Sequence, residues 1–413
     1  MVHVCRDGDA AASMRVAMAQ SNNQSVVQTT PESWDPVTSR YFRSDRFAPN
    51  TEAERAVLGL ILRRGPMTQI QIAREIDRSQ QTVSRLLSRL IERGSLRQGE
   101  RVSSGKRGQL SINVEIVPDY AYTFGIGILW DALSVTLMDF SGRIIDRRMT
   151  PMMTMTHDNV VAELRRIIDE LISQWGIDET HVFGAGVGIP GPFMLATGQI
   201  NTPLTLEEWA NINVEAVLAN DLELPVWVEN DGNAAAIGES LFGVGRWASD
   251  FVYVYIATGV GGGIVHAGEL VRGAVGNAGE IGQLLPPNMY PHPNLELLRK
   301  IICKHGVDVP SVTDLVLNFD ENWPGVDEWI ARVRDSMTLI ASASAALLDP
   351  EVIVIGGRIP RPLAERMIPH VEIYDHRRRS FARPLPRIVV AEVEGDAAAM
   401  GAAALSFNKY FFR

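Results

Sequence analysis

The chain has 413 residues, of which 46% are hydrophobic, and a formal net charge of −10. This length predicts two or three domains. No apolar run reaches about 18 residues, so no membrane span is expected. The N-terminus has no apolar segment, so no signal peptide is expected either. With only two cysteines, Cys5 and Cys303, neither a disulfide framework nor a cysteine-rich zinc site is expected. Together these features predict a cytoplasmic protein.

Residues 1–46 are rich in Ser, Gln, Asn and Thr and show little periodicity, which predicts a disordered leader. The pattern changes over residues 47–116. Apolar residues at helical spacing predict three helices, the last of which begins at Ser79 and ends before Gly94. A strand at 95–97, a loop reading SSGKRGQ and a return strand at 110–114 follow. This order is typical of a winged helix-turn-helix DNA-binding domain.

The third helix carries polar and basic residues on the face opposite its apolar stripe. Gln and Arg at such positions can reach base edges in a major groove, while Ser and Arg can contact phosphates. Basic residues in the wing suit phosphates or a minor groove. The candidate DNA-contacting residues are Gln80, Gln81, Ser84, Arg85 and Arg89 on the helix, and Lys106 and Arg107 in the wing.

The charge of the chain is segregated. Residues 51–114 contain eleven Arg and one Lys against five Glu and one Asp, a net charge of +6, which leaves −16 for the remainder. This segregation favours DNA binding by that segment alone. The alternative is a three-helix packing module with a solvated basic face, and the agreement of helix, turn, wing and charge favours the DNA-binding domain.

From residue 117 the chain alternates strands and helices. Residues 117–240 predict an α/β lobe with a mixed sheet, and residues 241–395 predict a second lobe that begins with two strands and continues with mostly helical segments. Residues 396–413, which are rich in Ala, predict a helix that returns to the first lobe. A cleft between two such lobes is where a small ligand would bind.

Polar and glycine residues gather in one stretch of the α/β region. Asn230 and Asp231 stand at a strand-to-helix turn, a glycine hairpin follows at 258–263, and Glu280 is a second acid. This layout suits a sugar kinase, in which a general base faces a hydroxyl and flexible backbone lies close to phosphates. The plainer alternative for each residue is a capped turn or a surface acid.

Four motifs give the chain a resemblance to the ROK family, which comprises repressors, open reading frames and kinases. They are GVGIPGP (186–192), VENDGNAAAIGE (228–239), ATGVGGGIVHAGELVRGAVGNAGEIG (257–282) and DPEVIVIGG (349–357). The resemblance covers about residues 120 to 405, and a winged helix ahead of it is similar to the transcriptional-repressor branch. It implies a two-lobed, actin-like sugar-kinase fold, also described as a ribonuclease H-like ATPase fold.

The resemblance also implies roles for single residues. Asp231 matches the general base of ROK kinases, and Asn230 beside it matches a sugar contact. Glu280 matches a contact to a sugar hydroxyl, and Glu296 is a further candidate. Gln283 stands where the family has a sugar-contacting histidine, so the identity of the ligand is in doubt.

The glycine hairpin has two interpretations. By resemblance it is the remnant of a phosphate loop, and by its composition it is a tight β-turn that holds the second lobe together. The residues concerned are Thr258, Gly259, Gly261 and Gly262.

One departure from the family concerns catalysis. ROK kinases begin with a phosphate and metal loop reading Asp-x-Gly-Gly-Thr. Alignment back from Asp139 places Gly127, Leu129, Trp130 and Asp131 at those positions. A bulky Trp would block the approach of a phosphate, and an extra carboxylate would repel it. The sequence therefore predicts that ATP-dependent phosphate transfer is lost.

A second departure concerns metal. Most family members bind structural zinc through a His and three Cys, whereas here Gln283 follows GEIG and the next residues contain no Cys. His292 is a lone candidate ligand, and a lone histidine is more often a surface residue. No metal and no cofactor are predicted.

The sequence thus predicts a sugar-responsive DNA-binding transcriptional regulator, a repressor of carbohydrate uptake or catabolism genes. Its kinase-derived cleft would bind a sugar or sugar derivative without phosphorylating it. The expected partners are a double-stranded operator and further copies of the chain, in a homodimer or homotetramer. Two alternatives remain: a ROK sugar kinase with an appended DNA-binding head, in which Asp231 is catalytic, and a DNA-binding protein whose core only dimerises.

Overall fold

The computed structural model describes residue 47 and residues 50–103, 110–194, 199–375, 384–393 and 395–412. The predicted leader and the wing residues Lys106 and Arg107 lie outside these ranges. Along the described parts of the chain, none of the helices has both the length and the apolar character that crossing a membrane requires.

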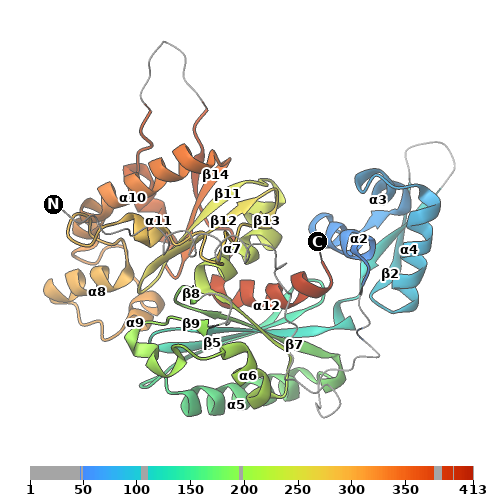
Figure 1. Cartoon of the computed structure of the whole chain (residues 1–413), viewed down its shortest axis with the longest axis horizontal. Coiled ribbons are helices and arrows are strands. Elements are labelled where there is room, and N and C mark those ends of the chain that lie inside the picture. Colours follow the sequence, from blue (N-terminus) through green and yellow to red (C-terminus); the bar gives the residue numbers. More distant parts are fainter. Residues whose placement is uncertain are drawn as a thin grey trace, which may run out of the picture. The chain divides into compact units, whose positions relative to one another are not determined.

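The N-terminal elements form a winged helix. Its helices are α2 (Glu52–Arg64), α3 (Gln69–Glu75) and α4 (Gln80–Glu92), and its strands β1 (Met67–Thr68), β2 (Leu96–Ser103) and β3 (Leu110–Ile116) form a sheet in the order β1-β3-β2 (Figure 1). Side chains cap each helix start: Thr51 and Thr68 form capping boxes with Glu54 and Gln71, and Ser79 accepts a hydrogen bond from the backbone N–H of Thr82. The first strand of the wing runs to residue 103 and not to 97, because it pairs with β3 along its length with one irregularity between Gln98 and Arg101.

The first lobe is built on a five-stranded mixed sheet in the order β10-β7-β4-β5-β6. The strands are β4 (Tyr122–Ile128), β5 (Ala132–Asp139), β6 (Ile144–Pro151), β7 (Val182–Ile189) and β10 (Val226–Asn230). Strands β4, β7 and β10 are parallel, while β5 and β6 continue the sheet antiparallel. Helices α5 (His157–Trp175) and α6 (Val214–Leu222) bury their apolar residues against one face of this sheet (Figure 1).

The second lobe has a sheet in the order β13-β12-β11-β14-β15. Its strands are β11 (Phe251–Ile256), β12 (Val260–His266), β13 (Glu269–Leu270), β14 (Val352–Gly357) and β15 (Arg387–Val390), and its helices are α8 (Leu295–Lys304), α9 (Val312–Leu317), α10 (Val326–Leu348) and α11 (Arg361–Met367). The apolar residues of these helices form one core with β11 and β14. Smaller elements are the strands β8 (Phe193–Met194) and β9 (Gln199–Ile200) and short 3-10 helices at Pro118–Tyr120, Glu179–His181, Leu204–Trp209, Val244–Arg246, Ile281–Leu284 and Ile368–His370.

Two helices made largely of small residues lie between the lobes. They are α7 (Asp231–Phe242), which follows β10, and α12 (Ala397–Tyr410), the last helix of the chain. The two helices approach so closely that a Cβ atom on Gly401 would lie 1.6 Å from the backbone oxygen of Ala234. On its other side α12 lies against β4 and β7, where a Cβ on Gly125 or Gly186 would lie 1.9 or 1.8 Å from a carbonyl oxygen of α12. The last helix thus packs against the sheet of the first lobe.

Candidate functional site

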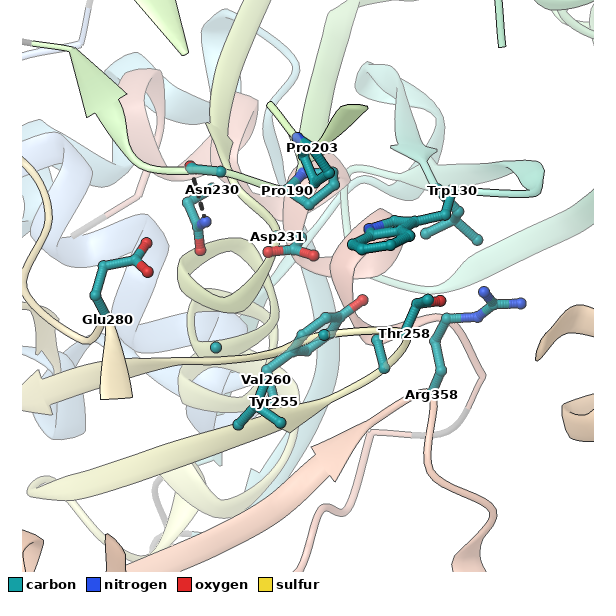
Figure 2. Close-up of a pocket in the computed structure, with 15 residues that line it drawn as sticks. Trp130, Pro190, Pro203, Asn230, Asp231, Tyr255, Thr258, Val260, Glu280 and Arg358 are labelled. Carbon is teal, nitrogen blue, oxygen red and sulfur yellow. Dashed lines mark hydrogen bonds between the residues drawn. The ribbon is translucent and has the colours of Figure 1, made fainter. Parts of the chain in front are cut away.

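A cavity of about 140 Å³ lies where β10 passes into α7 and where the turn between β11 and β12 faces the turn between β4 and β5. Figure 2 shows Asp231 near its centre, with Glu280 on one side, Trp130 on the other and the ring of Tyr255 below. The lining residues are Leu129, Trp130, Pro190, Gly191, Pro203, Asn230, Asp231, Tyr255, Ala257, Thr258, Gly259, Val260, Gly261, Glu280 and Arg358. This volume is below the roughly 300–1,000 Å³ that is usual for drug-sized ligands, so it suits one small molecule.

Asn230 sets the geometry at the start of α7. Its side-chain oxygen accepts hydrogen bonds from the backbone N–H groups of Gly232 (2.9 Å) and Asn233 (3.2 Å), which caps the helix. Its amide nitrogen donates to the carbonyl oxygen of Gly191 at 3.1 Å. Asn230 therefore ties the helix start to the loop after β7 and fixes the direction of the neighbouring Asp231.

Asp231 is a carboxyl group with an unusual proton affinity. Burial raises its pKa to about 7, the carboxylates of Glu280 and Asp396 push it in the same direction, and a hydrogen bond from the backbone N–H of Gly232 opposes them. Burial likewise raises the pKa of Glu280. Near neutral pH the carboxyl group of Asp231 can thus either accept a hydrogen bond from a ligand hydroxyl or donate one to it.

The glycine hairpin closes one wall of the cavity. It connects β11 to β12, and the backbone N–H of Ala257 donates to the carbonyl oxygen of Gly259 at 2.9 Å. Thr258, Gly259 and Gly261 line the cavity, and a Cβ on either of these two glycines would meet open space. Gly262 does not line it, because it packs beneath α7, where a Cβ on Gly232 would lie 2.7 Å from the nitrogen of Gly262.

The opposite wall is the turn between β4 and β5. This turn stands where ROK kinases have their phosphate loop. Leu129 is buried and lines the cavity together with Trp130. The next residue, Asp131, turns its carboxylate to the second lobe, where it accepts hydrogen bonds from Thr313 and Arg358. Side chains of the chain itself therefore occupy this wall.

Two buried donors at the cavity have no partner among the described residues. They are the hydroxyl of Tyr255, a residue that is 1% exposed, and the Nε of Arg358, a residue that is 5% exposed. A buried donor without a partner is unfavourable, so both atoms mark places for polar atoms of a ligand.

Two predicted contacts do not line this cavity. Glu296 lies on α8, where Arg299 donates two hydrogen bonds to it at 2.8 and 2.9 Å, and these hydrogen bonds outweigh burial and lower its pKa. Gln283 is exposed on the short helix Ile281–Leu284. The structure therefore brings Asn230, Asp231 and Glu280 together and leaves the other two predicted contacts apart from them.

Sequence reasoning missed Tyr255 and Arg358. Tyr255 lies in the strand FVYVYI, whose six residues are all buried, so no periodicity distinguished it from core residues. Arg358 directly follows the motif VIVIGG, and a charged residue after a buried strand is a signal that could have been used. Pro190 directly follows β7, and Pro203 directly precedes the 3-10 helix Leu204–Trp209.

His292, the lone candidate ligand that the sequence analysis set aside, lies next to a backbone carbonyl group. A ring nitrogen of His292 lies 3.1 Å from the carbonyl oxygen of Leu285. Over the described ranges, no three His, Cys, Asp or Glu side chains gather as a metal site would require.

The predicted DNA-contacting residues of α4 share one exposed face. Gln80, Gln81, Ser84, Arg85 and Arg89 are all exposed, whereas the apolar stripe of Val83, Leu86, Leu87 and Leu90 is buried. Arg89 is partly engaged, since its Nε lies 3.4 Å from Glu54.

Buried Glu54 holds α2 to the end of α4. Burial works to raise its pKa, but hydrogen bonds from Thr51 and the charges of Arg93 and Arg89 bring the pKa below its ordinary value. The free polar face of α4 is therefore its N-terminal half, the part of a recognition helix that contacts base edges in a major groove.

Comparisons with known proteins agree with this architecture. Residues 123–295 match the ROK family model, and residues 51–108 match the MarR family model. The chain is 27% identical over 227 residues to the xylose repressor of Caldicellulosiruptor bescii, a match that spans 55% of this chain and 56% of that repressor. It is 26% identical over 318 residues to the glucokinase of Halalkalibacterium halodurans, spanning 67% of this chain and 92% of that enzyme.

A solved structure gives the same result for the fold. It is a ROK family transcriptional regulator described as a homologue of the E. coli MLC protein, with a TM-score of 0.59 and 20% identity over 86% of this chain and 94% of that one. At this identity the likeness concerns the fold alone. Together with the two family matches it confirms the predicted fold class, a winged helix followed by a two-lobed sugar-kinase fold.

Proposed function

Because the chain carries a ROK family domain behind a MarR-type winged helix, we infer that it is a sugar-responsive transcriptional regulator that represses genes of carbohydrate uptake or catabolism. The observation that carries this inference is the combination of an exposed polar and basic face on α4 with a cavity that presents carboxyl groups to a small ligand. The similarity to a xylose repressor supports it. The match spans 56% of that repressor, so the activity and the sugar are our proposal.

In this function the cavity senses a sugar and does not phosphorylate it. Asp231 and Glu280 contact hydroxyl groups, and Asn230 positions Asp231. Leu129, Trp130 and Asp131 fill the wall from which a kinase would hold the phosphates of ATP, which supports a site that has kept sugar binding and lost transfer. Asp231 is then a ligand contact and not a general base.

The DNA partner is a double-stranded operator read by α4. A homodimer or homotetramer would place two winged helices on half-sites about one helical turn apart. Sugar binding would change the closure of the lobes and hence the operator affinity. A repressor of this kind acts in the cytoplasm, where the operator is.

The test is titration of the full-length protein on its own upstream DNA with and without candidate sugars. We expect specific binding that weakens steeply with salt and changes by at least about tenfold with one sugar class. Arg85→Ala should reduce operator affinity about tenfold or more, while Arg334→Ala on the exposed surface of α10 should leave it unchanged. Specific binding to no upstream fragment under any condition would contradict the proposal.

A second candidate function is a sugar kinase with a DNA-binding head. The observation that favours it is the raised pKa of Asp231, about 7, which suits a general base at neutral pH. ADP release measured over a panel of hexoses, pentoses and amino sugars decides between the two. Sugar-dependent ADP release that Asp231→Asn abolishes would establish the kinase. No increase in ADP release with any sugar supports the regulator.

A further inference from the structure

Asp131 forms a polar contact across the cleft that no sequence motif predicts. It lies in the first lobe, in the turn between β4 and β5, and both of its carboxylate oxygens accept hydrogen bonds from the second lobe. Oδ2 accepts from the backbone N–H of Thr313 at 2.9 Å, and Oδ1 accepts from the Thr313 hydroxyl at 2.9 Å and from Nη1 of Arg358 at 3.3 Å.

The three residues form a closed and largely buried network. Nη2 of Arg358 donates to the Thr313 hydroxyl at 2.7 Å, so the hydroxyl accepts from the guanidinium and donates to the carboxylate. The side chain of Arg358 is 3% exposed and that of Asp131 is 24% exposed, while Thr313 as a residue is 1% exposed. A buried network in which donors and acceptors are matched is held firmly, because breaking it leaves charged groups without partners.

The second-lobe half of the network has the chemistry of an anion site. A guanidinium, a hydroxyl and a backbone N–H converge on one carboxylate, and this is a donor set that proteins use for phosphate and carboxylate groups. Here the anion is supplied by the chain itself. Asp131 neutralises Arg358, which is the one cationic side chain among the described residues that line the cavity.

The other titratable groups at the cavity are acids. Asp231 and Glu280 line it, and Asp396 lies close enough to raise the pKa of Asp231. A phosphate group brought into this space would meet carboxylates while the nearby guanidinium is already paired. Burying an unpaired charge is strongly unfavourable, whereas hydroxyl groups can bond to carboxyl groups of either protonation state.

We propose that Asp131 is a specificity-determining residue: it fills the anion position between the lobes and thereby makes the cavity select an uncharged sugar over its phosphorylated form and over nucleotides. This inference rests on the proposed sugar-binding function and names the ligand class of the same cavity. The two unpartnered donors, the Tyr255 hydroxyl and the Nε of Arg358, are available to hydroxyl or ring oxygens of such a ligand.

The contact has a second consequence, because it joins the lobes. Asp131 belongs to the first lobe, while Thr313 on α9 and Arg358 after β14 belong to the second. The network therefore links the two lobes beside Trp130. Removing the carboxylate both opens the anion site and loosens closure.

The experiment compares matched pairs of ligands by isothermal titration calorimetry on the full-length protein. The probes are glucose, mannose, xylose and N-acetylglucosamine, each beside its terminal phosphate ester, together with ADP, ATP and inorganic pyrophosphate. For the wild-type protein we expect at least one neutral sugar to bind at least tenfold more tightly than its phosphate ester, and no nucleotide to bind more tightly than that sugar.

The variant Asp131→Asn keeps the volume of the side chain and removes its charge. We expect it to bind pyrophosphate or the phosphate esters at least tenfold more tightly than the wild-type protein does, so the preference for the neutral sugar shrinks. Asp335→Asn, at an exposed position on α10, is the matched control and should change neither affinity.

The outcomes separate this inference from the proposed function. A wild-type protein that binds a phosphate ester as tightly as its neutral parent, or a folded Asp131→Asn protein with unchanged selectivity, overturns the inference and leaves sugar sensing intact. Failure of every sugar in both forms to bind overturns the proposed function and the inference with it. The wild-type comparison alone decides the case if Asp131→Asn does not fold.

Discussion

Asp231 combines two opposing influences on a single carboxyl group. It is the first residue of α7, and a helix N-terminus favours the charged form of an acid. Burial and the nearby carboxylates Glu280 and Asp396 favour the neutral form, and they win, since the pKa rises to about 7. The cavity thus stores an unfavourable charge above neutral pH, which a bound polyol with several hydroxyl groups can relieve.

This raised pKa predicts a pH-dependent stability. Between the ordinary pKa of 3.8 and about 7, folded Asp231 keeps a proton that the unfolded chain has released, so its contribution to stability falls as pH rises through that window. Asp231→Asn, which is never charged, should therefore raise the free energy of unfolding at pH 8 by about 1–3 kcal/mol. The gain should vanish near pH 4. Urea denaturation at both pH values measures it, and an equal effect at both would contradict the assigned pKa.

Asn230 illustrates a residue whose polar atoms serve the fold. Its oxygen caps α7 and its nitrogen holds Gly191, so Asn230→Ala should lower the free energy of unfolding by about 1–2 kcal/mol. Ligand affinity should also fall, because Asp231 loses its fixed position. Thermal unfolding and sugar titration of the same variant measure the two effects. Ser is also a strong N-cap residue and adds no charge, so Asn230→Ser should recover part of the stability, and a Tm of Asn230→Ala equal to the wild-type value would contradict the capping role.

At the scale of elements, the contact of α7 with α12 decides how the lobes meet. Small residues on both helices let the two backbones pack so closely that no Cβ atom fits between them at Gly401 and Ala234. The same helix α12 also lies against the glycines of β4 and β7. Gly125 in GIGI and Gly186 in GAGVGI are therefore required by close packing against this helix.

Gly401→Ala tests this contact. The added Cβ would lie 1.6 Å from the oxygen of Ala234, and backbone on both sides cannot yield, so we expect a loss of roughly 3 kcal/mol or more, or failure to accumulate as folded protein. Gly259→Ala is the control, because its Cβ would meet open space. Differential scanning calorimetry of both variants gives the comparison. A Tm for Gly401→Ala equal to that of Gly259→Ala would refute the close approach.

At the scale of the whole molecule, α12 joins the ligand cavity to the winged helix. Its first turn begins at Asp396 beside the cavity, and α7, which starts with Asp231, packs along it. At its other end, Arg55 of α2 donates to the carbonyl oxygens of Asn408 (2.8 Å) and Phe412 (2.9 Å). Favourable charge at a helix C-terminus and direct hydrogen bonds together make this a firm attachment.

An aromatic group reinforces the attachment. Phe47, Tyr120, Phe140, Phe183 and Phe411 pack edge to face or, for Tyr120 and Phe140, at a tilt, at centroid distances of 4.9 to 6.2 Å, and all five are fully or nearly fully buried. They come from the winged-helix segment, the first-lobe sheet and the end of the chain. A shift of α12 would therefore displace the winged helix that it contacts. This contact gives sugar binding a physical route to the DNA-binding face.

Arg55→Gln is the variant that tests this route. It removes the ionic cap from α12 but leaves α4 untouched, so operator affinity without sugar should stay within about threefold of the wild-type value. The response of that affinity to sugar should shrink by at least about threefold, because coupling energies of this kind are about 1–3 kcal/mol. Fluorescence anisotropy on labelled operator measures both quantities. The control is Arg64→Gln, at the exposed end of α2, the helix that also carries Arg55. A wild-type response of operator affinity to sugar in Arg55→Gln would exclude the route.

Local patterns in the sequence were enough to predict the elements and part of the site. The winged helix was predictable because its caps and apolar stripes are short-range features, and Asn230 and Asp231 because they are neighbours at one turn. The wing strand was predicted too short, since its length depends on pairing with β3. Glu296 and Gln283 were grouped with the site by resemblance, and the structure places neither at the cavity wall.

By itself the sequence determined the order of the elements, the basic N-terminal segment and the family to which the α/β region is similar, because periodicity, charge and motifs are carried by residues close together in the chain. Only the tertiary structure decided that Asp131 meets Thr313 and Arg358, residues 182 and 227 positions away. It also decided that Tyr255 turns its hydroxyl to the cavity and that Arg55 caps the last helix. Contacts between distant residues depend on how elements pack, and no local pattern encodes them.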